Sequence, residues 1–225
     1  MGTDNIFHKK RAGQLKRERK SLKEYKNSIL IVCEGEKTEP KYFEKFPVAN
    51  IKVVTIGTGT SNITLIENAI TIWKTKADEG KYFESLWCVF DRDDFPQRNY
   101  NQAFKNILTE ENRLNRRYRK KTGRKIKVSI AYSNEAFELW YLLHFDYIDT
   151  ALSRSQYQSM LSKRMKRKYI KNNPDMYRLL NEYQQTAIEN AKKLEINIEV
   201  ASKHNHNPST TVYKLVEELN SYLKQ

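Results

Sequence analysis

Two short apolar runs that end abruptly in carboxylates constrain the fold of this chain more than any other feature. Residues 29–33 are followed directly by Glu34, and residues 86–90 are followed by Asp91 and Asp93. Apolar runs of this length are typical of strands that are buried on both faces of a parallel sheet. Open α/β sheets bind ligands outside the carboxyl ends of their strands, which is where these acids would lie. The pattern therefore predicts an acidic, ligand-binding edge of a sheet.

The rest of the chain supplies the strands and helices that such a sheet requires. Four segments have the apolar or alternating pattern of strands: 28–33, 51–56, 86–91 and 126–132. Helical periodicity occupies the segments between and after them: 38–46, 61–78, 100–118 and 134–145. Right-handed βαβ connections would join these elements into a mainly parallel sheet flanked by helices, which is the α/β class.

Three parts are expected along the chain. Residues 1–27 form a basic N-terminal segment, residues 28–146 form the α/β core, and residues 147–225 form a C-terminal helical extension packed on that core. Helical patterns in the extension cover three segments: 153–165, 174–194 and 209–223. The chain of 225 residues is long enough for this arrangement.

Composition places the protein in a reducing, aqueous compartment. No apolar run approaches the roughly 20 residues that span a membrane, and residues 1–11 lack the apolar stretch of a secretory signal. The two cysteines, Cys33 and Cys88, both lie inside apolar runs and are expected to be buried free thiols. We therefore expect a cytoplasmic protein with no membrane partner.

The whole chain carries a net charge of +14, and its positive charge is concentrated in three segments. Residues 1–26 hold nine Lys or Arg against three Asp or Glu; residues 113–127 hold nine basic and no acidic residues; residues 163–171 hold six and none. Such segments on a mildly acidic body indicate binding to a nucleic-acid backbone, although solvated helix faces would give the same composition. Tyr118 and Tyr169 lie among the charges, where they could stack on bases. The candidate phosphate contacts here are Arg116, Arg117, Arg119, Lys120 and Lys121.

Glu34, Asp91 and Asp93 are the first candidates for a metal centre. Carboxylate oxygens are the hard ligands that Mg²⁺ prefers. Asp91 and Asp93 are two residues apart, so continued strand geometry would point both side chains to the same side. The alternative is a polar turn that ends the strand. Glu34 precedes Gly35, and it is interpreted as a metal ligand or a general base.

Other residues near these acids have two interpretations each. Glu36 and Glu39 could help bind a metal, whereas Glu39 also suits the positive start of the following helix. Lys37 is a candidate phosphate contact or an ordinary surface charge. Glu138 lies in an apolar helix, where it would either complete the metal site or form a structural pair.

The segment 202–215 is a further candidate for phosphate binding. If Ser209 begins a helix, its free N–H groups would bind an anion, with Lys203, Ser209 and Thr210 as contacts; ordinary capping by Ser209 is the alternative. His204 and His206 lack a matching pair of ligands, which argues against zinc. The turn at 57–62 lacks the lysine of a P-loop, which argues against an ATP site there.

Four stretches, in order along the chain, resemble the RloB-like family, whose fold resembles the Toprim domain. They are LIVCEGEKTEPKYF (30–43), DRDDF (91–95), SNEAFELWYLLHF (133–145) and NPSTTVYKLVEEL (207–219). The resemblance implies a Mg²⁺- or Mn²⁺-dependent nuclease of bacterial anti-phage defence. It further implies a partner ATPase of the ABC or AAA type. The Toprim glutamate corresponds to Glu34 and the Toprim aspartates to Asp91 and Asp93, while Glu36 and Glu39 compete for the place of a second glutamate.

Two hypotheses follow. The first is a metal-dependent endonuclease whose catalytic residues are Glu34, Asp91 and Asp93. The second is a nucleic-acid-binding adaptor without catalytic activity that recruits an effector. A primase or topoisomerase fragment is disfavoured, because nothing resembles a strand-transfer tyrosine in a second domain. The sequence leaves open whether the substrate is DNA or RNA and whether the chain forms a homo-oligomer.

Overall fold

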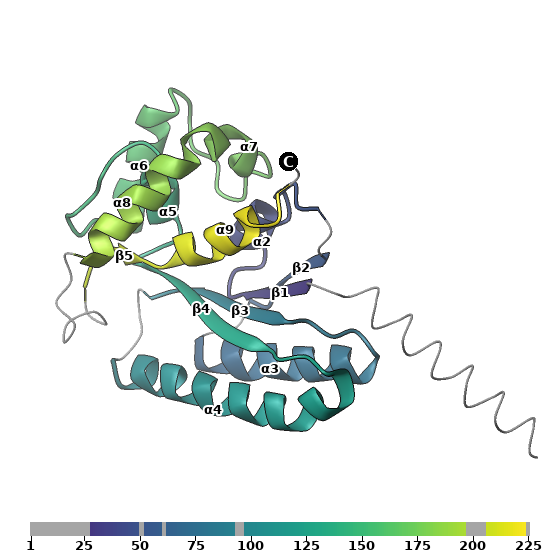
Figure 1. Cartoon of the computed structure of the whole chain (residues 1–225). Coiled ribbons are helices and arrows are strands. Elements are labelled where there is room, and N and C mark those ends of the chain that lie inside the picture. The colour runs from purple at the N-terminus through teal and green to yellow at the C-terminus, as the bar shows by residue number, and fades with distance from the viewer. Residues whose placement is uncertain (1–27, 50–51, 60–61, 93–96, 197–205, 224–225) are drawn as a thin grey trace, which may run out of the picture.

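A twisted five-stranded sheet forms the centre of the molecule (Figure 1). The computed structural model describes residues 28–49, 52–59, 62–92, 97–196 and 206–223. The strands are β1 (Ser28–Cys33), β2 (Lys52–Gly57), β3 (Ser85–Asp91), β4 (Lys127–Asn134) and β5 (Ser209–Thr210), and their order across the sheet is β2-β1-β3-β4-β5. The first four are parallel, and β5 is antiparallel to β4. The predicted α/β class with a mainly parallel sheet is confirmed.

Helices cover both faces of this sheet (Figure 1). On one face lie α3 (Asn62–Asp78) and α4 (Gln97–Thr122). The other face carries the remaining helices: α2 (Thr38–Phe43), α5 (Glu138–Leu142), α6 (Arg154–Arg164), α7 (Met176–Leu180), the short 3₁₀ helix η1 (Asn181–Tyr183), α8 (Gln184–Ile196) and α9 (Val212–Asn220). No helix in the described part of the chain is both long and apolar enough to cross a membrane.

The strand alternation divides the interior into two cores. In β1, Ile29 and Ile31 point into the core beneath α9, whereas Leu30 and Val32 point into the core against α3 and α4. Every residue of β1 is buried, which explains its continuous apolar sequence. Cys33 and Cys88 are buried free thiols, as expected from their positions in apolar runs.

The C-terminal helices share a core with the sheet rather than forming one of their own. Tyr157 in α6, Leu180 in α7 and Leu215 in α9 belong to the same buried cluster as Ile31 and Val89. Burial of these side chains against the strands stabilises the position of each helix, because removing apolar area from water is favourable. The described parts of the extension, residues 147–196 and 206–223, therefore pack directly on the core, and β5 extends its sheet.

Several element boundaries differ from the sequence prediction. The helix predicted from residue 134 begins at Glu138, because β4 continues to Asn134, where Ser133 and Asn134 pair with β5. The helix predicted from residue 209 begins at Val212. The single helix predicted over 174–194 consists of α7, η1 and α8. The predicted segment 1–27 lies outside the described residues.

Candidate functional site

Glu34 and Asp91 meet at the carboxyl ends of the two neighbouring strands β1 and β3. The backbone N–H of Glu34 donates to the carbonyl of Val89 (2.8 Å), and its carbonyl accepts from the N–H of Gly59 (2.9 Å). The N–H of Asp91 donates to the Glu34 carboxylate (3.2 Å). These bonds fix the backbone of Glu34 on both sides and hold its side chain beside Asp91. The predicted meeting of the two acids at one sheet edge is thus found in the structure.

The two acids line a cleft of about 410 Å³. One wall comes from the loop after β1 and the start of α2, and the other comes from α5, α6 and the loop before α7. Its full lining is Glu34, Gly35, Glu36, Lys37, Thr38, Glu39, Asp91, Phe137, Glu138, Arg154, Lys171 and Asn172. The cleft thus brings together four of the five predicted metal ligands, and the fifth, Asp93, lies outside the described residues.

Glu39 points from the first turn of α2 into the loop that contains Gly35. A Cβ atom at Gly35 would come within 2.2 Å of a Glu39 carboxylate oxygen, so any larger residue there would require that carboxylate to shift. Glu39 is only 5% exposed, and its Oε2 has no hydrogen-bond partner in the described structure. Burial raises the pKa of Glu39, and the neighbouring charge of Glu138 raises it further. A cation near this oxygen would offset the cost of burying its charge.

The pKa of Asp91 is also raised by its surroundings in the cleft. Burial is the main cause that raises its pKa well above the usual range, and the neighbouring charge of Glu39 raises it further. Arg154 opposes both effects, because its Nη2 lies 3.3 Å from Asp91 Oδ2. A group of carboxylates with this electrostatic strain is typical of a functional site.

The structural pair predicted for Glu138 is found, and its role in a metal site stays a prediction. Glu138 lines the cleft as a buried side chain, and its Oε1 accepts a hydrogen bond from the Tyr169 hydroxyl (3.2 Å). Burial, followed by the charge of Glu138, raises the pKa of Tyr169. Tyr169 is itself buried, so the prediction that it stacks on bases is wrong: its ring packs inside the protein and its hydroxyl orients Glu138.

The cationic part of the cleft comes mainly from residues that the sequence analysis did not identify. Lys37 was predicted, whereas Arg154 and Lys171 were not. Lys171 ends the basic segment 163–171, so its charge was visible in the sequence, but nothing there placed it at the acids. Arg154 follows no motif, and only the packing of α6 brings it to Asp91.

The donor chemistry of the cleft suits a divalent cation such as Mg²⁺ or Mn²⁺. Glu34 and Asp91, with Glu39 and Glu138 beside them, offer carboxylate oxygens, and the buried Glu39 Oε2 has no hydrogen-bond donor in the described structure. Within the described ranges, no three His, Cys, Asp or Glu side chains are already arranged to hold one ion. The residues thus fit such a cation by chemistry, while their side chains are not gathered around a single point.

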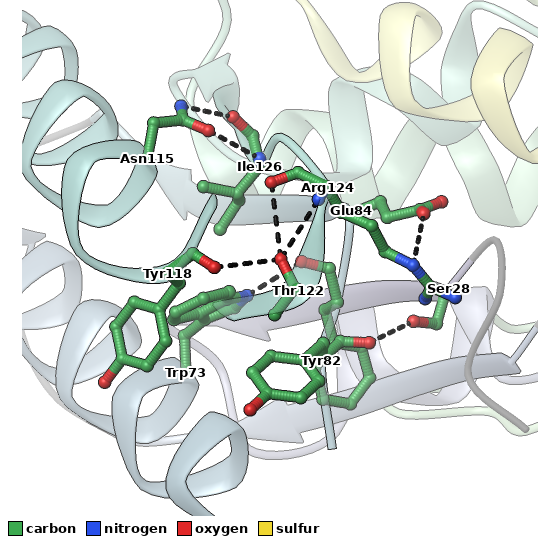
Figure 2. Close-up of polar contacts among 10 residues, drawn as sticks. Ser28, Trp73, Tyr82, Glu84, Asn115, Tyr118, Thr122, Arg124 and Ile126 are labelled. Carbon is green, nitrogen blue, oxygen red and sulfur yellow. Dashed lines mark hydrogen bonds and ion pairs between the residues drawn. The ribbon is translucent and has the colours of Figure 1, made fainter. Parts of the chain in front are cut away.

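The basic end of α4 lies at the opposite edge of the sheet from the cleft. Its C-terminal turn leads to β4, whose first N–H, that of Lys127, donates to the carbonyl of Glu84 just before β3 (2.8 Å). Figure 2 shows this edge, where Arg124 pairs with Glu84 (3.5 Å) and the Asn115 side chain bonds both the N–H and the carbonyl of Ile126. The basic end of α4 and the cleft acids therefore lie at opposite ends of the parallel strands, and none of the described α4 side chains lines the cleft.

The predicted phosphate contacts of α4 are exposed, but their tyrosine is not. Arg116, Arg117, Arg119 and Lys120 all face solvent, and the side chain of Lys121 is outside the described part. Tyr118 is buried with its ring against Trp73 (4.9 Å between centroids), and its hydroxyl donates to Asp78. Tyr118 is therefore a core residue, and the prediction that it stacks on bases is wrong.

Ser209 and Thr210 form a strand instead of a helix start. Both are buried, and the Thr210 hydroxyl donates to the carbonyl of Tyr132 (3.0 Å), while the Ser209 hydroxyl donates to that of His206 (2.8 Å). Both hydroxyls are used inside the protein, so the predicted role of these residues is corrected to pairing β5 with β4. Lys203 and His204 lie outside the described residues.

Comparison with known proteins gives one significant match. The family model described as RloB-like protein matches residues 29–219, which include most of β1, the cleft acids and most of α9. Searches of curated proteins and of solved structures returned no significant match. Because the family model covers most of the sequence, the chain belongs to the RloB-like protein family.

Proposed function

We propose that this protein is a metal-dependent nuclease that hydrolyses phosphodiester bonds in DNA or RNA. The observation that carries the proposal is the meeting of Glu34 and Asp91 at the ends of adjacent parallel strands, inside a cleft that also contains cationic side chains. Acids alone would repel a polyanion, and cations alone would only bind it. Both together suit a reaction at a phosphate.

The cleft residues have separate roles in this proposal. Glu34 and Asp91, with Asp93, would hold Mg²⁺ or Mn²⁺, and Glu39 and Glu138 complete the acidic lining. A bound divalent cation would lower the pKa of a water molecule and stabilise the leaving oxygen. The hydrogen bond from the Asp91 N–H orients Glu34, which would act as a metal ligand or as a general base that accepts a proton from water. Lys37 and Lys171 would bind the substrate phosphates.

The cellular role in the proposal comes from the family resemblance. A Toprim-like nuclease of bacterial anti-phage defence would act in the cytoplasm with a separate ATPase of the ABC or AAA type. Such a partner would supply ATP hydrolysis, because residues 57–62 lack the lysine that a P-loop uses to bind phosphate.

A cleavage assay tests the proposal. The full chain would be incubated with plasmid DNA, bulk RNA and tRNA, in Mg²⁺ and in Mn²⁺, with and without a candidate partner ATPase of the ABC or AAA type. We expect metal-dependent cleavage of at least one substrate, and its loss in EDTA. Absence of cleavage in every combination would contradict the proposal.

A nucleic-acid-binding adaptor is the second candidate, and one observation favours it. The exposed cations of α4 lie at the far edge of the sheet from the cleft, where they could bind a backbone independently of the acids. An adaptor would bind nucleic acid equally well with and without a divalent cation, with an affinity that falls steeply as salt rises. It would cleave nothing with any metal.

A further inference from the structure

The backbone of Arg154 is fixed at the start of α6, while its side chain extends to Asp91 in the cleft. It is the first residue of α6, directly after Ser153, which caps the helix through a reciprocal capping box with Gln156. Its guanidinium reaches Asp91 at 3.3 Å, and 39% of its side chain remains exposed. A fixed backbone with a long, partly solvated side chain allows the guanidinium to change partner without moving the helix.

Lys171 is held at the cleft by its neighbour Asn172. The Thr38 hydroxyl donates to Asn172 Oδ1 (2.5 Å), and the Lys41 ammonium donates to the Asn172 carbonyl (3.1 Å). Asn172 adopts a left-handed backbone (φ 65°), which asparagine tolerates better than most residues. The loop before α7 is thus fastened to α2, and the exposed Lys171 stands at the rim of the cleft.

The cleft carries more negative than positive charge. Five carboxylate residues line it, against the three cations Lys37, Arg154 and Lys171. A polyanion entering this cleft would meet net repulsion unless a further cation enters as well. Arg154 forms an ion pair with Asp91, at the position where a divalent cation would bind in the proposed nuclease.

We propose that Arg154 is a resident counter-ion of Asp91 that a divalent cation displaces, and that the released guanidinium then binds a phosphate of the nucleic acid together with Lys171. Arg suits this exchange, because it pairs with carboxylate and phosphate through the same planar donors. The inference rests on the proposed function in two respects, which are that a divalent cation binds at Asp91 and that the anionic ligand is a phosphodiester. A purely structural ion pair would instead orient Asp91, and its loss would weaken cation binding.

Mn²⁺ binding without nucleic acid tests the displacement. The full chain would be titrated with Mn²⁺ at pH 7, and free Mn²⁺ would be followed by electron paramagnetic resonance. Arg154→Gln should bind Mn²⁺ about two- to five-fold more tightly, which is the range that an ion pair of this exposure is worth. The matched control is Arg164→Gln, which removes a second Arg–Asp pair of α6, to Asp146 (2.6 Å), outside the cleft lining. It should leave Mn²⁺ affinity unchanged.

The second arm measures phosphate binding. Short fluorescein-labelled single strands of DNA and of RNA would be bound in Ca²⁺ over a range of salt concentrations. Arg154→Gln and Lys171→Gln should each weaken binding and reduce the slope of log affinity against log salt by about 0.7. Arg164→Gln should do neither. Arg154→Lys should restore most of the affinity, because it keeps the charge.

The outcomes separate this inference from the proposed function, because neither arm measures cleavage. Tighter Mn²⁺ binding by Arg154→Gln that disappears when Asp91→Asn is added supports the displacement, even if the wild type cleaves nothing. Unchanged or weaker Mn²⁺ binding by folded Arg154→Gln would overturn it, and so would the absence of Mn²⁺ binding by the wild type. Oligonucleotide binding that is unaffected by both substitutions would overturn the phosphate role.

Discussion

The backbone N–H of Asp91 donates to the carboxylate of Glu34, which joins the ends of β3 and β1 at a single point (3.2 Å). Fifty-six residues separate the two acids in the sequence, and the parallel register of β1 with β3 brings them together. The residues of β1 and β3 that lead up to the two acids are buried in the core. The position of each acid therefore depends on the rigid core rather than on a loop. Rigid support of this kind is what a catalytic constellation requires.

Glu39→Gln should raise the unfolding temperature at pH 7 in metal-free buffer. Burial raises the pKa of Glu39, so the charged form destabilises the native state at pH values above that pKa. An uncharged amide of the same shape removes this cost. As the pH falls and Glu39 itself becomes protonated, the advantage should shrink. Thermal unfolding followed by circular dichroism measures both effects.

The matched control for that experiment is Glu189→Gln, which changes an exposed acid of α8 whose partner is Gln185. It should leave the unfolding temperature nearly unchanged. A lower unfolding temperature for Glu39→Gln than for the wild type would show that the Glu39 charge stabilises the fold.

The strands and the two strand-end acids could be predicted from sequence because burial on both faces leaves an apolar run. β1 and β3 are such runs, and an acid stands at the carboxyl end of each: Glu34 follows β1, and Asp91 is the last residue of β3. β5 could not be predicted, because two residues carry no periodicity. Ser209 and Thr210 form a strand only because β4 offers them partners.

Arg154, Lys171 and Asn172 escaped prediction for a different reason. They reach the cleft through the packing of α6 and of the loop before α7, and tertiary packing leaves no local pattern in the sequence. Tyr118 and Tyr169 were misjudged because an aromatic residue among basic neighbours was interpreted as a surface residue. In both, the ring is buried while the neighbouring Lys and Arg side chains extend to solvent.

His144 should make stability depend on pH between about 4 and 6.5. Burial lowers its pKa from 6.5 to about 4, so the unfolded chain binds a proton that the native state does not. Its contribution to stability is therefore complete above pH 6.5 and is lost as the pH falls towards 4. The loss amounts to about 3 kcal/mol over this range.

Urea unfolding of the wild type and of His144→Gln at several pH values checks this. The wild type should lose more unfolding free energy than the variant between pH 6.5 and pH 4.5, because glutamine takes up no proton. Parallel curves for the two proteins over this range would contradict the prediction.

Asn115→Ala should destabilise the protein by about 1–3 kcal/mol. The Asn115 amide donates to the Ile126 carbonyl (2.9 Å) and accepts from its N–H (3.0 Å), which fastens the end of α4 to the entry of β4 (Figure 2). Alanine would leave both backbone groups without these bonds. Asn112→Ala, at an exposed position of the same helix, is the control for helix propensity. Equal urea midpoints for the two variants would show that the Asn115 bonds contribute nothing.

Replacing Arg116, Arg119 and Lys120 together with Gln should weaken nucleic-acid binding and lower its salt slope by about 2. These side chains are exposed at the edge of the sheet away from the cleft, so cleavage at saturating substrate should stay unchanged. Fluorescence anisotropy at several salt concentrations measures the slope. A salt slope equal to that of the wild type would remove α4 from the binding surface.

The most direct test of the account is metal-dependent cleavage by Glu34→Gln and Asp91→Asn beside the wild type and the Glu189→Gln control. Each variant keeps the shape of its side chain, and circular dichroism establishes that it is folded. The account predicts that both cleft variants lose cleavage by at least about a hundredfold, the scale of a removed catalytic group, while the control retains it. Full cleavage by either folded cleft variant would contradict the account.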